Sequence, residues 1–239
     1  MDKNKYSLTV IVPFFNEQKT LKNSVLNLIR EEVASEIILV DDFSSDSSYQ
    51  IAKDLSKKYS IIKLLKKPEN EGKGSAVIYA KEWVKSTHVI VHDADLEYSP
   101  SDIASLFNIS KKYPDALILG SRTQGVKNRK KIYKSLVIIN KFFAIFFSIL
   151  NNYKISDIAT CYMLVPTEFL KKQINAEKGF GIEVEILSKF LKYHNQIIEF
   201  PISYNGRRFA DGKKIKITDG LVIFYKIISY SKFISLFRF

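Results

Sequence analysis

The first half of the chain alternates short apolar runs with longer amphipathic segments. The apolar runs are five to seven residues long and rich in Val, Ile and Leu, as in strands that are buried on both faces; they cover residues 8–14, 36–41, 61–65, 87–92 and 116–120. The segments between them are long enough for helices. This order predicts an α/β fold built from repeated strand–helix–strand units.

Two of the intervening segments carry signals for the start of a helix. Ser45 or Asp46 is placed to cap a helix that runs through Asp54. Residues 99–102, Ser-Pro-Ser-Asp, offer a cap, a first-turn proline and an N3 carboxylate ahead of a helix over 103–113. Both signals therefore place a helix shortly after the end of a predicted strand.

A series of this kind forms a mainly parallel sheet, and its right-handed crossovers bring the carboxyl ends of the strands to one edge. Ligands bind at that edge in open α/β sheets. Five carboxylates and an arginine follow the predicted strands there: Glu17, Asp41, Asp42, Asp93, Asp95 and Arg122. We therefore expect these charged side chains to converge on one site.

The second half of the chain is less regular. Its predicted elements are an apolar helix over 135–150, a strand over 157–165, a helix over 180–193, a strand over 196–203 and a last helix from residue 221. The last helix follows a Gly- and Lys-rich loop and has a polar stripe of Lys226, Ser229, Lys232 and Ser235. We expect an α/β domain over residues 1–205, followed by a basic loop and amphipathic helix over 206–239 that packs on this domain or on a membrane.

The two halves of the chain differ in charge. Lys and Arg number 37 against 25 Asp and Glu, a net charge of +12, and residues 120–239 carry +13 while residues 1–119 carry −1. A basic half beside a half with clustered carboxylates indicates a cation and phosphates at their junction. A solvated basic surface is the simpler alternative.

Composition narrows the class of protein further. The single cysteine, Cys161, excludes an internal disulfide and a metal–thiolate cluster, which fits a reducing cytoplasm. The first residues show no secretory pattern, so we expect no signal peptide. The most apolar windows, 132–150 and 221–239, contain Lys or Arg, each of which costs about 2.5–3.5 kcal/mol at the centre of a bilayer, so neither is predicted to span a membrane.

The pair Asp93 and Asp95 is the sharpest chemical signal. Separated by one residue after a buried strand, the two carboxylates point the same way if the chain stays extended, so they can share one hard cation. Mg²⁺ or Mn²⁺ prefers such oxygen ligands and keeps positions for substrate phosphates. Glu97 is a candidate third ligand, with a solvated residue in the first turn of a helix as its alternative.

Other candidate sites are weaker. Gly72-Lys73-Gly74 lacks the remaining residues of a dinucleotide fingerprint or a P-loop, and we interpret it as the start of a helix. The histidines His88, His92 and His194 show no ligand spacing, and Cys161 has no evident base partner, so we interpret all four side chains as structural.

Several segments, in this order, resemble the family 2 glycosyltransferases with a GT-A fold: VIVPFFNE, EIILVDDFSSDSS, NEGKG, VHDADLEYSP and LGSR. The later DIATCYMLV and YNGRRFADGKKIKITDG are similar to the branch of dolichol-phosphate mannosyltransferases and bacterial polyprenyl-phosphate sugar transferases. The resemblance covers nearly the whole chain. It implies a GT-A, Rossmann-like fold with a mainly parallel central sheet flanked by helices, extended by a basic C-terminal amphipathic helix.

The resemblance also implies roles for individual residues. Pro13, Phe15, Glu17 and Asp42 would hold the nucleoside, and Asp93 and Asp95 the metal and the diphosphate, with Glu97 where relatives often have Gln. Arg122, Ser135, Arg207 and Lys213 match positions that contact donor or acceptor phosphates in relatives, and Lys131 stands where an arginine is usual. Among these residues we expect Asp93, Asp95, Arg122, Arg207 and Lys213 to carry catalysis.

The activity that follows is an inverting, metal-dependent transfer from a UDP- or GDP-sugar to a polyprenyl- or dolichyl-phosphate acceptor, with Mg²⁺ or Mn²⁺ as cofactor. An anionic lipid phosphate needs no general base. A saccharide hydroxyl, the alternative acceptor, would need one, and Glu183 or Glu185 is the candidate. A solvent-facing helix is the simpler expectation for these two glutamates.

Two further classes compete with this interpretation. A non-catalytic protein that binds nucleic acid or anionic lipid would explain the basic half of the chain. It would leave the clustered carboxylates without a function, so we expect no nucleic-acid partner. A receiver-like domain also has paired aspartates at strand ends. Such a domain is about half as long as this chain, however, and its aspartate pair follows its first strand. We expect a cytoplasmic protein in peripheral contact with the cytoplasmic face of the inner membrane; a homodimer, in which the apolar helices pair instead, is left open.

Overall fold

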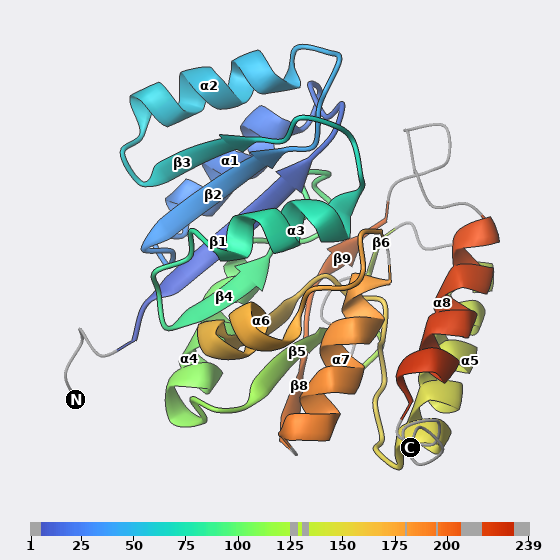
Figure 1. The fold of residues 1–239 in the computed structure, drawn as a ribbon. Coiled ribbons are helices and arrows are strands. Elements are labelled where there is room, and N and C mark those ends of the chain that lie inside the picture. The colour runs from blue at the N-terminus through green and yellow to red at the C-terminus, as the bar shows by residue number, and fades with distance from the viewer. Residues whose placement is uncertain are drawn as a thin grey trace.

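A seven-stranded sheet in the order β3-β2-β1-β4-β7-β5-β8 runs through the protein and is flanked by helices on both faces (Figure 1). The structure is a computed structural model that describes residues 6–124, 129–130, 134–179, 181–194, 196–206 and 217–231, with the backbone alone for 129–130, 134–136 and 217–219. The predicted α/β fold with a mainly parallel central sheet is confirmed.

The strands of this sheet are β1 (Leu8–Phe14), β2 (Glu36–Asp41), β3 (Ile62–Lys66), β4 (His88–Val91), β5 (Leu117–Ser121), β7 (Met163–Pro166) and β8 (Ile197–Pro201). The first five lie within two residues of their predicted bounds. All neighbours pair in parallel except β7, which is antiparallel to both β4 and β5. A separate two-stranded pair consists of β6 (Arg129–Lys130) and β9 (Tyr204–Asn205).

The helices cover the two faces of the sheet with two separate apolar cores. Helices α1 (Leu21–Arg30), α2 (Ser48–Lys58) and α4 (Ser101–Lys112) pack on one face, and α3 (Lys73–Lys81), α6 (Thr167–Gln173) and α7 (Ile182–Tyr193) on the other. Successive side chains of a strand point to opposite faces, so Val10 joins the first core and Ile11 the second. Burial on both faces explains why β1 is apolar at nearly every position.

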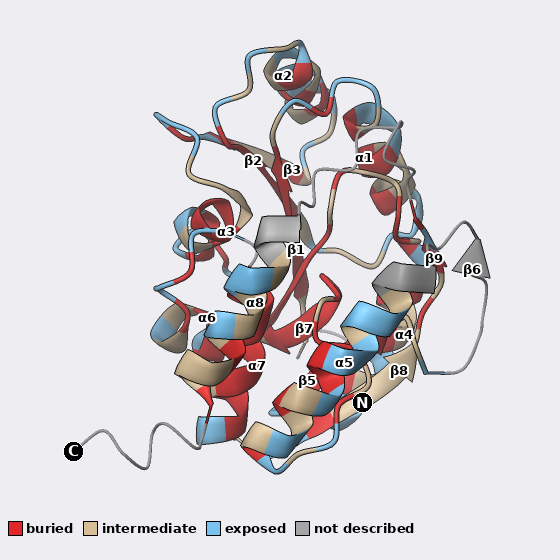
Figure 2. Ribbon diagram, turned by 90° about the vertical axis from the view of Figure 1, so that its right-hand side faces the viewer, coloured by how far each residue is buried: buried red, intermediate tan, exposed pale blue. Residues whose placement is uncertain are grey.

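Helices α5 (Lys134–Asn151) and α8 (Ile217–Tyr230) lie side by side (Figure 1). They contribute Phe147 and Ile227 to the second core, and Phe146 stacks on Phe224 with ring centroids 4.8 Å apart. Figure 2 looks onto these two helices and shows exposed positions repeated along both. The exposed side chains include large apolar ones: Ile138, Phe142, Ile145 and Ile149 on α5, and Leu221 and Tyr225 on α8. We call these six residues the outer apolar face.

Within the part of the chain that the structure describes, no helix combines the length and the hydropathy needed to cross a bilayer. Residues 232–239, which hold the rest of the predicted polar stripe, lie outside the described residues, and α8 ends at Tyr230.

The predicted helix caps are confirmed only in part. Asp46 accepts an N–H at the start of its helix, although the N-cap position is Ser47, and the Ser99 hydroxyl bonds the Ser101 hydroxyl. α2 begins at Ser48 after an N-cap at Ser47, and Asp46 accepts hydrogen bonds from the backbone N–H groups of Ser48 and Gln18. α4 begins at Ser101 without a side-chain cap, and the Asp102 carboxylate accepts the N–H of Ser203 at 2.7 Å. Asp102 therefore ties α4 to the segment between β8 and β9.

The predicted strand over 157–165 is also shorter than expected. Only residues 163–166 form β7, and the preceding residues run as a loop whose Asp157 binds Arg122. The predicted strand over 196–203 corresponds to β8, which ends at Pro201. The short β9 follows after two residues, beyond the predicted bounds. These segments hold side chains near the carboxyl edge of the sheet, where the charged residues meet.

Candidate active site

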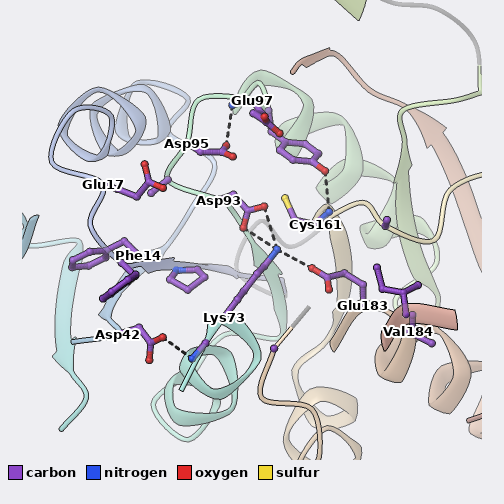
Figure 3. A pocket seen from close by; sticks show the side chains of 18 of the residues that line it. Phe14, Glu17, Asp42, Lys73, Asp93, Asp95, Glu97, Cys161, Glu183 and Val184 are labelled. Carbon is purple, nitrogen blue, oxygen red and sulfur yellow. Dashed lines mark hydrogen bonds and ion pairs between the residues drawn. The ribbon is translucent and has the colours of Figure 1, made fainter. Parts of the chain in front are cut away.

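A pocket of about 350 Å³ opens at the carboxyl ends of β1, β2 and β4 (Figure 3). Eight residues to which the family resemblance gives a role, all with described side chains, line it: Pro13, Phe15, Glu17, Asp42, Asp93, Asp95, Glu97 and Arg122. Asp41 does not line the pocket. It is fully buried, and its carboxylate accepts the backbone N–H of Ser44. The expected convergence is thus present for four of the five strand-end carboxylates and for the arginine.

Four other predicted residues cannot be placed in this pocket. Lys131, Arg207 and Lys213 lie outside the described residues, and Ser135 belongs to α5, where only its backbone is described. Their expected contacts with phosphates stay predictions.

Asp93, two residues after the end of β4, forms an ion pair with a lysine of α3. The Lys73 Nζ lies 2.8 Å from Asp93 Oδ1 and 3.1 Å from its Oδ2, and 2.8 Å from Glu183 Oε1 (Figure 3). Lys73 is the first residue of α3, and Glu183 lies in the first turn of α7. One ammonium group therefore joins two carboxylates that come from different elements.

Asp95 and Glu97 make different contacts. Asp95 Oδ1 accepts the backbone N–H of Glu97 at 3.0 Å. The Glu97 carboxylate accepts the phenolic O–H of Tyr204 from β9 and is buried. Burial, which disfavours the phenolate, raises the pKa of Tyr204, so this phenol stays protonated and keeps donating to Glu97. Glu97 is not the solvated helix residue considered as its alternative.

The pocket offers a divalent ion two aspartates. Across the described residues, His, Cys, Asp and Glu side chains nowhere gather in groups of three or more that could hold a metal. Two carboxylates in a shared cleft still fit Mg²⁺ or Mn²⁺, because these ions take hard oxygen ligands and complete their shell with water and substrate phosphates. Asp93 and Asp95 are the residues that would hold such an ion. In this structure the positive charge beside Asp93 is the ammonium group of Lys73.

Asp42 fixes the turn that leads into α3. Its carboxylate accepts the Lys67 ammonium at 2.6 Å and the N–H groups of Glu71 and Gly72 at 3.2 and 2.7 Å. Gly72 has a φ of +97°, which glycine adopts without a steric cost. Because α3 starts here, as predicted, Asp42 helps to position Lys73.

The loop between α6 and α7 packs against the start of α3 and is held by Glu185 of α7. Glu185, fully buried, accepts the N–H groups of Asn175, Ala176 and Glu177 and the ammonium of Lys189. The expectation that Glu183 and Glu185 face solvent was wrong. Their helix packs between the sheet and α8, so the exposed fraction is 8% for Glu183 and 0% for Glu185. Only Glu183 reaches the pocket.

The same loop contacts both α3 and α8. Gly74 packs so closely on it that a Cβ would lie 2.1 Å from the carbonyl oxygen of Glu177. The Glu177 carboxylate accepts the Lys226 ammonium and the Tyr230 hydroxyl, each at 2.7 Å. Through Glu177, the start of α3 and the face of α8 are held by one loop.

Arg122 lines the pocket while forming an ion pair. Its guanidinium and its backbone N–H all donate to Asp157, and the guanidinium carbon lies 5.1 Å from the centre of the Tyr204 ring. The carboxylate that binds Arg122 is completely buried. A phosphate contact by Arg122 would therefore add to an existing structural role.

Sequence reasoning missed Lys73, and it treated Cys161 as structural. Cys161 borders the pocket beside Asp93, although it is buried and burial raises the pKa of its thiol. His92 is structural as predicted: it bonds Ser24 and Tyr162 at 2.9 and 2.8 Å, and burial lowers its pKa to about 4. The position of Lys73 between two glycines at a helix start was the available signal, but its partner Glu183 lies 110 residues away.

Comparison with known proteins adds the family context. Residues 9–173 match the family model described as Glycosyl transferase family 2. A dolichol-phosphate mannosyltransferase from Pyrococcus furiosus is 28% identical over 214 residues, covering 86% of this chain, which spans 58% of that relative's length. A UDP-N-acetylglucosamine–dolichyl-phosphate N-acetylglucosaminyltransferase from Methanococcus voltae is 26% identical over 241 residues, covering 92% of this chain and 94% of the relative.

The fold is shared with solved structures. Glucosyl-3-phosphoglycerate synthase from Mycobacterium tuberculosis, solved with Mn²⁺, UDP and phosphoglyceric acid, superposes with a TM-score of 0.71 at 14% identity, covering 95% of this chain and 78% of that one. At this identity the similarity establishes the architecture of the sheet and its helices.

Proposed function

The chain belongs to glycosyl transferase family 2 and is a glycosyltransferase, and from this premise we propose that it moves a sugar from a nucleoside diphosphate sugar to a polyprenyl phosphate, with a divalent metal ion at Asp93 and Asp95. The observation that carries the proposal is that one pocket holds both aspartates together with Glu17, Asp42 and Lys73. Such a pocket places carboxylates and a cation at the edge where α/β sheets bind ligands.

The donor nucleoside is assigned to the side of the pocket formed by β1 and β2. Pro13 and Phe15 offer apolar surface there, and Glu17 and Asp42 offer carboxylates to sugar or base hydrogen-bond donors. Asp42 already binds the turn before α3, so its contribution includes holding that wall of the pocket. The base itself is left open between uracil and guanine.

The diphosphate is assigned to the floor of the pocket. A divalent ion bound by Asp93 and Asp95 would neutralise the negative charge that develops on the departing nucleoside diphosphate. Lys73 supplies a further positive charge at 2.8 Å from Asp93, and Glu183 holds its ammonium from the other side. These residues orient the diphosphate and keep its charge compensated.

The proposed acceptor is an anionic lipid phosphate, which can attack without a general base. Basic residues would position it, and the sequence supplies Lys131, Arg207 and Lys213, all of them outside the described residues. Ile158, Val184 and Ile223 give the pocket an apolar side toward α7 and α8. The names of the relatives from Pyrococcus furiosus and Methanococcus voltae support this acceptor class.

A lipid acceptor requires contact with a membrane, and the outer apolar face is the proposed contact. Phe142 is 56% exposed and Ile149 72%, on a helix that begins within the basic segment 127–134. Apolar side chains beside Lys and Arg favour the surface of an anionic bilayer. We assign the protein to the cytoplasmic side of such a membrane as a peripheral protein, with a homodimer through the same face as the competing arrangement.

A saccharide hydroxyl is the second candidate acceptor, favoured by one observation. Glu183 lies in the pocket instead of facing solvent, so a carboxylate is present that could accept a hydroxyl proton. It would first have to exchange Lys73 for the acceptor. Product analysis with a short polyprenyl phosphate and with an oligosaccharide, each offered with the same donor, separates the two candidates.

The test of the donor and metal is a thermal-shift panel of UDP-, GDP- and dTDP-sugars with and without Mn²⁺. One nucleotide should raise the melting temperature, and raise it more with Mn²⁺, because a ligand that binds only the folded state stabilises it by mass action. If no nucleotide changes the melting temperature, and a salt-sensitive complex with DNA persists after Asp93 and Asp95 are replaced, the proposed donor and metal are wrong and the basic half binds nucleic acid.

A further inference from the structure

Lys73 occupies an unusual position for a lysine in a pocket proposed to bind a divalent cation. Its ammonium lies 2.8 Å from Asp93 and 2.8 Å from Glu183, and only 14% of its side chain is exposed. Asp93 is one of the two aspartates proposed to hold the metal. A resident positive charge therefore already contacts a carboxylate that the metal would use.

The charge on Lys73 is permanent in this setting. One carboxylate oxygen of Asp93 and one of Glu183 each lie 2.8 Å from its Nζ, and two such neighbours favour the charged ammonium. The backbone also holds the lysine in place: it begins α3 directly after Gly72, which Asp42 binds, and Gly74 packs against the carbonyl oxygen of Glu177.

A fixed ammonium near Asp93 repels a second cation. In a partly buried pocket this repulsion is screened much less than at the protein surface. A diphosphate in the same pocket would reverse the balance, because its negative charge attracts both the ammonium and the metal ion. Lys73 should thus oppose the metal alone and favour the metal together with the donor.

We propose that Lys73 couples the two ligands, so that a divalent ion binds Asp93 and Asp95 weakly in the free protein and tightly once a nucleoside diphosphate is present. The inference rests on the proposed function, since it assumes that donor and metal share this pocket. Coupling is reciprocal: if the nucleotide strengthens metal binding by a given factor, the metal strengthens nucleotide binding by the same factor. In this arrangement Lys73 is a positioning residue that sets the order of assembly.

The experiment measures binding and needs no turnover. Mn²⁺ is titrated into the full chain by electron paramagnetic resonance, alone and with saturating UDP, GDP or dTDP. In the wild type, the best nucleotide should tighten Mn²⁺ binding by about tenfold or more. Lys73→Met should bind Mn²⁺ alone about tenfold more tightly than the wild type and lose most of the coupling, whereas Lys73→Arg, which keeps the charge, should retain it.

Two further variants serve as controls, one for misfolding and one for the loss of a positive charge elsewhere. Lys73→Met leaves Glu183 buried opposite no cation and could fail to fold, so the double variant Lys73→Met/Glu183→Gln removes both charges together and should show the same loss of coupling. Lys172→Met, which removes the same charge from an exposed i,i+4 pair with Glu168, should behave like the wild type.

The outcomes are distinguishable. A wild type that binds no Mn²⁺ with any of the three nucleotides overturns both the proposed function and this inference. A wild type with clear coupling, combined with unchanged or weaker Mn²⁺ binding in both Lys73→Met variants, overturns the inference and leaves the proposed function standing.

Discussion

Arg122 donates from Nε to Oδ2 of Asp157 and from a terminal nitrogen to Oδ1, each at 2.8 Å, forming a forked ion pair at the end of β5. Asp157 is fully buried and also accepts the Nδ2 of Asn140 at 3.0 Å. The pair therefore fastens three segments to one another: the end of β5, helix α5 and the loop before β7.

Breaking this pair should destabilise the protein. Asp157→Asn leaves the Arg122 guanidinium without its counter-charge, and removing one partner of a buried ion pair typically costs about 3–5 kcal/mol. Urea unfolding at pH 7 measures the loss. Glu168→Gln, in an exposed pair with Lys172, is the matched control and should change stability by less than about 1 kcal/mol. Equal effects of the two substitutions would contradict a structural role for Arg122.

The same pair predicts how stability depends on pH. Burial alone would raise the pKa of Asp157, but Arg122 outweighs it and holds the pKa below its usual value of 3.8. The folded protein thus releases this proton more readily than the unfolded chain. The contribution of Asp157 is present at pH values above about 4, the pKa of an aspartate in an unfolded chain, and is lost as pH falls below it. The stability difference between wild type and Asp157→Asn should accordingly shrink between pH 5 and pH 2.5, as measured by urea unfolding at each pH.

Asp95→Asn should abolish sugar transfer while leaving the fold intact. The substitution keeps the size of the side chain and removes the charge proposed to hold the metal ion. The amide oxygen of the new Asn can still accept the hydrogen bond from the Glu97 N–H. Transfer of radiolabelled sugar and thermal unfolding are the two measurements. Asp54→Asn, on the surface of α2, is the control and should transfer normally. Wild-type transfer by Asp95→Asn would remove the metal site from the proposed mechanism.

Gly74→Ala should be strongly destabilising, because the new Cβ would lie 2.1 Å from the Glu177 carbonyl oxygen and neither backbone can move without disturbing the other. A loss at or above the upper end of typical overpacking costs, about 3 kcal/mol, is expected in chemical denaturation. Gly179 lies in the same loop, but a Cβ there meets no atom within 4 Å. Gly179→Ala should therefore cost far less, and a similar cost for both alanines would show that the close packing is not the cause.

Phe142→Glu should weaken binding to vesicles that contain anionic lipid by about tenfold or more, since it places a negative charge within the outer apolar face. Phe142 is 56% exposed, so the melting temperature should hardly change. Tyr79→Glu adds the same charge to an exposed aromatic position on α3 and is the control for net charge. If vesicle binding is unchanged but the oligomeric state changes, the face joins two copies of the chain instead.

Four strands of the first half, β1, β2, β4 and β5, were predictable because they are buried on both faces and therefore mostly apolar. The edge strand β3 was found from its Ile and Leu residues, although it also contains Lys63 and Lys66. The position of β7 was not, since an apolar run of four residues carries no information about which strands it will pair with. Antiparallel insertion between β4 and β5 depends on the path of the loop before β7, and that path is held by the contact of Asp157 with Arg122. Such a long-range ion pair leaves no local pattern in the sequence.

The candidate site was predicted from its carboxylates and not from its cation. Asp93 and Asp95 follow an apolar strand directly, so topology alone places them at the sheet edge. Lys73 resembles any lysine at the start of a helix, and its role becomes visible only when α7 brings Glu183 to it. The role of Asp102 was hidden in the same way: its carboxylate accepts the N–H of Ser203, far along the chain, which local sequence cannot reveal.

The antiparallel β7 has a consequence for how the protein is made. A nascent chain that has left the ribosome only as far as residue 121 has β4 with an open edge and β5 with no neighbour in the sheet until residues 163–166 arrive. Exposed strand edges recruit other chains, so pauses in translation or premature stops within this interval should favour aggregation or chaperone capture.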